Sequence, residues 1–73
     1  MLSEHARNAL GGIFSMIASR LKPANDIASA AEACASTGNH DGAFRIMLDV
    51  EQLTYEATTL LNAAGLIRRE DAT

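Results

Sequence analysis

The chain contains few cysteine, proline, aromatic or basic residues. Of its 73 residues one is Cys, one is Pro, none is Trp, and three are Phe or Tyr. The single thiol, Cys34, excludes an intrachain disulfide framework, and the low proline content argues against a disordered or fibrous chain. Six basic residues face nine acidic ones. Because phosphate backbones are bound by clustered Lys and Arg, we expect no direct nucleic-acid partner.

Long hydrophobic runs are also missing. The most apolar stretch covers residues 9–18 and is about half as long as a membrane-spanning helix. It is not typical of a secretory signal, because Glu4 precedes it and Arg20-Leu21-Lys22 follows where small residues should mark a cleavage site. We therefore expect a cytoplasmic chain with one domain over residues 1–73, no membrane partner, no cofactor and no bound metal.

The residues that dominate the chain favour helices. Ala, Leu, Met, Glu and Arg are frequent, and no segment alternates apolar and polar residues over the length of a strand. The sequence therefore predicts an all-α fold, with helices at about 3–21, 26–36 and 41–67 and a disordered end at 70–73. Ser3 is a candidate N-cap, and Lys22-Pro23 predicts the end of the first helix because proline disfavours helical geometry in the preceding residue. Thr37-Gly38 predicts the end of the second helix.

Apolar residues recur at helical spacing in the two long stretches. In the first stretch the steps are 4-3-4-4, at Ala6, Leu10, Ile13, Ile17 and Leu21. In the third stretch the repeat is an uninterrupted heptad seam, at Ala43, Ile46, Val50, Leu53, Ala57, Leu60, Ala64 and Ile67. The seam favours continuation of the helix through Gly65, although glycine is a poor helix former. The paired glycines Gly11 and Gly12 suggest a close helix contact or a mild kink.

These stripes predict a helical hairpin or a three-helix bundle, built from two long helices and one short alanine-rich helix. The short helix offers little apolar area to cover the long ones. We therefore expect the chain to dimerise into a four-helix-type bundle. The residues expected to mediate this interaction are Leu10, Ile13, Ile17, Ile46, Val50, Leu53, Ala57 and Leu60.

Few residues are candidates for chemistry. His5 lies in the first helical turn and could accept a phosphoryl group or bind a metal. Cys34, His40 and Asp41 do not have the paired spacing of a zinc site, so we expect no metal there. Asp49 and Glu56 lie one heptad apart and predict an acidic, solvated helix face rather than a catalytic pair.

Residues 4–13, with the sequence EHARNALGGI, resemble the phosphoacceptor motif of sensor histidine kinases, His-Glu-x-Arg-Asn-Pro-Leu-x-x-Ile. Residues 60–70 are similar to the end of the second helix of that family's hairpin. Alignment of Arg7, Asn8 and Leu10 places Glu4 at the phosphoacceptor position and His5 one residue later, and Ala9 replaces the proline. A shift of one residue turns a helical side chain by about 100°. The resemblance implies a hairpin that dimerises into a four-helix bundle.

The function that the sequence favours is that of a non-enzymatic interaction module, such as a small regulator or inhibitor. Its expected partner is a second copy, a larger protein, or both. A first alternative is histidine phosphotransfer through His5. A second alternative is an acidic mimic of nucleic acid that blocks a DNA- or RNA-binding complex, through Asp26, Glu32, Asp41, Asp49, Glu51 and Glu56.

Overall fold

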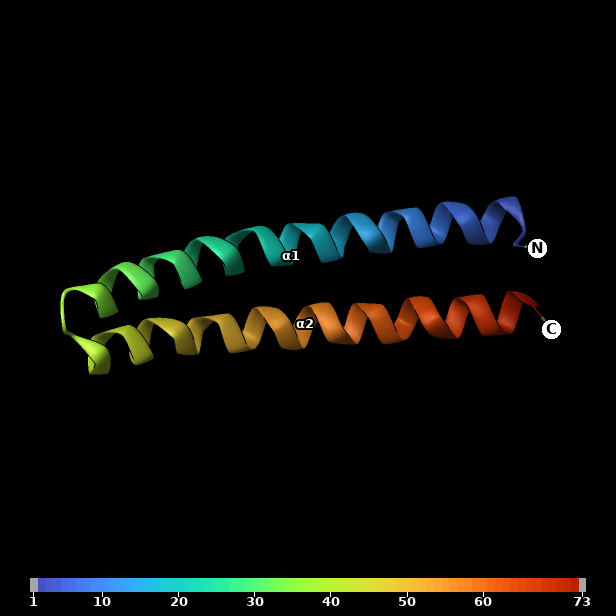
Figure 1. Cartoon of the computed structure of the whole chain (residues 1–73). Coiled ribbons are helices and arrows are strands. Elements are labelled where there is room, and N and C mark those ends of the chain that lie inside the picture. Colours follow the sequence, from blue (N-terminus) through green and yellow to red (C-terminus); the bar gives the residue numbers. More distant parts are fainter. Residues whose placement is uncertain (1, 73) are drawn as a thin grey trace.

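The computed structural model describes residues 2–72, which form a hairpin of two helices. Helix α1 spans Glu4–Ser36 and helix α2 spans His40–Ala72. They lie antiparallel along their whole length, so that both chain ends meet at one end and the turn forms the other (Figure 1). The Cα atoms extend over 53 × 14 × 13 Å. The predicted all-α fold is confirmed in its simpler form, the helical hairpin. Within the described residues, neither helix has an apolar stretch long enough to cross a bilayer.

The turn between the helices follows from three residues, Thr37, Gly38 and Asn39. Gly38 has a φ of +94°, a left-handed conformation that glycine adopts without a steric penalty. The Thr37 hydroxyl donates to the carbonyl of Cys34 at 2.7 Å and closes the last turn of α1. The Asn39 side chain accepts from the backbone N–H of Gly42 at 2.9 Å and caps α2. The stop predicted at Thr37-Gly38 is confirmed.

The break predicted at Lys22-Pro23 is wrong. Helix α1 passes through Pro23, so the predicted helices 3–21 and 26–36 are one helix, and no separate alanine-rich helix forms. A proline inside a helix removes one backbone hydrogen bond and crowds the carbonyl four residues earlier, at a cost of about 3 kcal/mol. Residues on both sides of Pro23, including Ile17 and Ala24, are partly or fully buried along α2. Breaking α1 would give up that packing, which outweighs the proline penalty.

The continuous helix changes the stripe predicted for its first half. Leu21 is exposed, and the neighbouring Arg20 is half-buried in its place. The stripe therefore keeps alternating steps of four and three to the end of α1, at positions 6, 10, 13, 17, 20, 24, 27, 31 and 34. Such a repeat of 3.5 residues keeps one face of a long helix toward its partner.

The seam predicted for α2 is confirmed, because each of its residues from Ala43 to Ile67 is buried or half-buried. The helix continues through Gly65, as predicted. It does not end at 67 but extends to Ala72, so the tail expected to be disordered at 70–73 is helical over residues 70–72. Thr73 lies outside the described residues.

The fully buried part of the contact between the helices is made mainly by alanine. Of the seven hydrophobic residues that are buried in the described chain, only Leu10 is large, the others being Ala6, Ala24, Ala31, Ala43, Ala57 and Ala64. Small side chains allow two helix axes to approach closely. The larger seam residues are only half-buried, namely Ile13, Ile17, Ile27, Ile46, Val50, Leu53, Leu60 and Ile67. A two-helix hairpin covers these side chains from one direction and leaves their flanks open.

Three helical glycines, Gly11, Gly12 and Gly65, are not used by the hairpin itself. A Cβ added at Gly11, Gly12 or Gly65 would meet no atom within 4 Å apart from its own helix and neighbours. The close helix contact expected at Gly11 and Gly12 is therefore not made between α1 and α2.

We expect Pro23→Ala to raise the free energy of unfolding by up to about 3 kcal/mol, because it restores the backbone donor and removes the clash in mid-helix. Urea unfolding followed by circular dichroism at 222 nm, at one fixed protein concentration, measures this change. As a reference, Gly12→Ala adds a Cβ in open space and should raise the same quantity by about 1 kcal/mol. If α1 were broken at residue 23, Pro23→Ala would leave the stability unchanged or lower it.

Candidate interaction surface

Large apolar side chains lie unevenly on the surface of the hairpin. Nine are exposed in the described chain: Phe14, Met16, Leu21, Phe44, Met47, Leu48, Tyr55, Leu61 and Leu66. Monomeric soluble proteins rarely expose apolar side chains as a large contiguous patch, so their distribution over the two helices is informative.

Five of the nine gather on one long side. Phe14 and Leu21 are seven residues apart in α1, and Met47 and Leu61 are fourteen apart in α2, so each pair lies on one face of its helix. Phe14 and Leu61 line the same hollow, which places both pairs on the same side of the hairpin. Phe44, three residues before Met47, lies at the outer edge of this side. We call the surface formed by these five residues the apolar flank.

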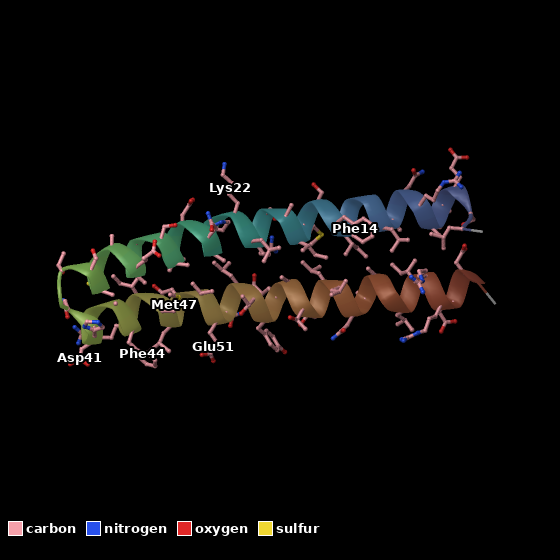
Figure 2. The ribbon with its side chains drawn as sticks, in the orientation of Figure 1. Phe14, Lys22, Asp41, Phe44, Met47 and Glu51 are labelled. Atoms are coloured by element: carbon pink, nitrogen blue, oxygen red, sulfur yellow. The ribbon has the colours of Figure 1, made fainter. Side chains whose placement is uncertain are left out.

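The geometry of the apolar flank is visible in the side-chain view. Phe14 extends from α1 toward α2, whereas Phe44 extends from α2 away from α1 (Figure 2). Phe14 is 54% exposed and Phe44 is 66% exposed. Aromatic rings with so much free area are typical of surfaces that a further chain covers.

A shallow hollow lies on the apolar flank near the open end of the hairpin. It has a volume of about 390 Å³ and is lined by Leu10, Phe14, Leu61, Ala64, Gly65, Arg68 and Arg69. Gly65 contributes to the hollow because its missing side chain leaves open space there. The heptad seam alone does not reveal this site, but a glycine in mid-helix is a signal that could have located it.

The opposite long side is more polar. His5, Leu66 and Glu70 line a hollow on that side. Asp49 and Glu56 lie twenty-one and fourteen residues before Glu70, which places all three acids on one face of α2. We call this surface the polar flank. Leu48 and Tyr55, seven residues apart, lie on the outer face of α2 between the two flanks.

An ion pair joins the helices at mid-length beside the seam. The Nε atom of Arg20 donates to Oε1 of Glu56 at 2.8 Å, and Nε2 of Gln52 donates to Oε2 at 2.9 Å. These hydrogen bonds, that of Gln52 first, hold the pKa of Glu56 below its ordinary value. Glu56 shares a helix face with Asp49, as predicted, but it is half-buried against Arg20 rather than part of a solvated face. The sequence pattern places Leu21 rather than Arg20 in the stripe and therefore does not predict this ion pair.

A second link closes the open end. Ser3 caps α1 by accepting from the backbone N–H of Ala6 at 3.1 Å, as predicted. It also donates its backbone N–H and its hydroxyl to the Asp71 carboxylate at 2.9 and 3.0 Å. Donation from Ser3, first from its backbone and then from its hydroxyl, lowers the pKa of Asp71. The N-cap residue of α1 is thereby hydrogen-bonded to the last turn of α2.

The residues considered above as candidates for chemistry are exposed or half-buried and make only local contacts. His5 is exposed and lies beside Leu66 and Asp71. The Cys34 thiol is half-buried and donates to the carbonyl of Asn39 at 3.5 Å. Nδ1 of His40 lies 3.3 Å from the carbonyl oxygen of Gly38 in the turn. Among the described residues, no group of three or more His, Cys, Asp or Glu side chains is placed to hold a metal ion.

The residues predicted to mediate interaction lie along the contact between α1 and α2. Two of them, Leu10 and Ala57, are buried there. The other six are half-buried and keep free surface beside the seam, namely Ile13, Ile17, Ile46, Val50, Leu53 and Leu60. The heptad pattern predicts the seam but does not indicate the apolar flank next to it.

Comparisons of the chain with protein-family models, with curated proteins and with solved structures give no match.

We expect the hairpin to lose stability in acid. Glu56 and Asp71 have lowered pKa values in the folded chain. Their stabilising contribution is therefore complete above the ordinary carboxyl pKa of about 4 and is lost as the pH falls through the lower folded values. The double variant Glu56→Gln, Asp71→Asn should show a weaker dependence of its unfolding free energy on pH between 5 and about 2, measured by urea unfolding at each pH. Asp49→Asn, which removes an exposed carboxylate, should keep the wild-type dependence, and an equal flattening in this control would contradict the assignment.

Proposed function

We propose that this chain is a non-enzymatic, cytoplasmic interaction module that associates through its apolar flank. It does so with a second copy in a four-helix-type bundle, with a larger protein that it regulates, or with both. The observation that supports the proposal is the placement of Phe14, Leu21, Phe44, Met47 and Leu61 on one side of the hairpin. The unpaired Cys34 fits a reducing compartment.

Packing energetics support the same conclusion. Full burial of a side chain such as Leu, Phe or Met contributes about 1.5–3 kcal/mol relative to full exposure. The flank residues are roughly half-exposed in the hairpin, from 42% for Met47 to 66% for Phe44. A partner that covers all five would therefore gain a substantial part of that contribution at each position, and this gain opposes the entropy lost in association.

The difference between the two flanks indicates which side of the hairpin a partner covers. The polar flank carries the exposed acids Asp49 and Glu70 beside the Arg20–Glu56 ion pair, and water solvates exposed charges well. A partner that covered the polar flank would have to remove this solvation, which is costly unless the partner supplies opposite charges. The apolar flank carries no such penalty over its central part.

Site-specific photo-crosslinking tests the proposal. A benzophenone amino acid replaces Phe14 on the apolar flank or, as a matched aromatic control, Tyr55 on the outer face of α2, which is 67% exposed. In cells that express the full chain, we expect a discrete crosslinked product from position 14 and none from position 55, detected by electrophoresis and identified by mass spectrometry. The absence of a product from position 14, or equal products from both positions, would refute association through the apolar flank.

A further inference from the structure

The hairpin exposes more surface than a compact protein of its mass. Its accessible surface is 5326 Å² for a chain of 7.7 kDa, whereas a compact monomer of this mass exposes about 4300 Å². The excess is about 1000 Å². A stable protein–protein interface buries about 800 Å² on each partner. Covering one long side of a hairpin that measures 53 Å in length would remove an area of this size.

The charges that border the apolar flank are separated along its length. Arg7 lies seven residues before Phe14, and Arg68 lies seven residues after Leu61. Both therefore lie near the open end. Glu32 lies eleven residues after Leu21, about three turns along the same face, and four residues from the turn end of α1. Glu51 follows Met47 by four residues in the half of α2 that adjoins the turn. Glu4, three residues before Arg7, also lies at the open end, where Arg7 and Arg68 leave a net positive charge. The flank is therefore net basic at one end and acidic toward the other, with apolar side chains between. Such a surface is complementary to itself when one copy is reversed end to end.

We propose that the occupant of the apolar flank is a second copy of this chain, packed flank to flank with its turn beside the open end of the first. This inference rests on the proposed function and names the partner. Each helix then runs antiparallel to its own counterpart, and the four helices form a closed bundle. The arrangement has two-fold symmetry, in which the same surface on both copies is buried.

The reversed orientation brings opposite charges together. With a rise of about 1.5 Å per residue, Arg7 lies roughly 45 Å from the turn and Glu32 roughly 8 Å from it. In a hairpin of 53 Å, reversal therefore places Arg7 opposite the partner's Glu32, and Glu32 opposite the partner's Arg7. The alternative, with both turns at the same end, would place Arg7 opposite the partner's Arg68. Charge placement of this kind selects orientation more than it adds affinity.

The same orientation matches shape along α2. Phe44 and Met47 lie roughly 8 and 12 Å from the turn, and Gly65 lies roughly 39 Å from it, near the open end. Reversal therefore brings the partner's Phe44 and the partner's Met47 opposite the hollow that Gly65 and Phe14 line. The helical glycine, which has no role within the hairpin, then leaves room for these side chains. Leu21, about midway along α1, lies near the two-fold axis.

Sedimentation equilibrium of the purified full chain at about 50 μM tests for the second copy. We expect a mass twice that of the 7.7 kDa chain. Leu21→Glu should weaken dimerisation at least about tenfold, because it places a charge near the two-fold axis of an apolar interface. Tyr55→Glu, an equally drastic change on the outer face, should leave the dimer intact. A monomeric wild-type chain, or equal loss of the dimer in both variants, would overturn the proposal.

Charge reversal tests the orientation. Arg7→Glu should raise the dimer dissociation constant by several-fold, because it faces the partner's Glu32, and the double variant Arg7→Glu, Glu32→Arg should return it toward the wild-type value. If the turns lay at the same end, Arg7→Glu would face the partner's Arg68 and would strengthen the dimer, which contradicts the proposal.

A distance measurement supplies an independent readout. A spin label on Asp41→Cys, near the turn, in a Cys34→Ser background should give a distance between labels of at least about 40 Å in the dimer, from the length of α2. A distance of about 25 Å or less would overturn the reversed orientation. If the purified chain is monomeric while position 14 still crosslinks to another protein in cells, this inference fails and the proposed function stands. If position 14 gives no product, the proposed function itself fails.

Discussion

The structure depends on one constraint, namely that two helices of 33 residues pack through a seam whose fully buried positions are mostly alanine. Six of the seven hydrophobic residues that are buried in the described part of the chain are alanines. Small side chains let the helices approach closely but contribute little apolar area. The larger residues next to them cannot be covered by a second helix alone. The apolar flank and the half-buried state of most large seam residues both follow from this arrangement.

The seam also explains the polar links between the helices. Alanine contacts repeat at every heptad of α2 except at Val50, so apolar packing alone distinguishes weakly between neighbouring registers. The Arg20–Glu56 pair at mid-length and the Ser3–Asp71 hydrogen bonds at the open end each fix one position of α1 relative to α2. Polar groups at a packed seam are known to specify register in this way.

Several features of the fold were predictable because they depend on local chemistry. Ser3 as a cap, Gly38 as the left-handed residue of the turn, and the α2 seam each require only a few neighbouring residues. Pro23 misled the prediction because its local effect is to end a helix, whereas its actual position is decided by packing along α2 on both sides. The same error affects the stripe of α1. If the helix stops at residue 21, its spacing does not distinguish Arg20 from Leu21 as the last residue of the stripe.

The sequence by itself determined that the chain is helical, where the turn lies, and which face of α2 is apolar, because spacing and capping encode these properties locally. Only the tertiary structure decided that α1 is unbroken, that Arg20 meets Glu56, and that Phe14, Leu21, Met47 and Leu61 share one side of the hairpin. These outcomes depend on how the two helices are aligned along their whole length. That alignment results from the summed packing of the whole seam, which no local pattern contains.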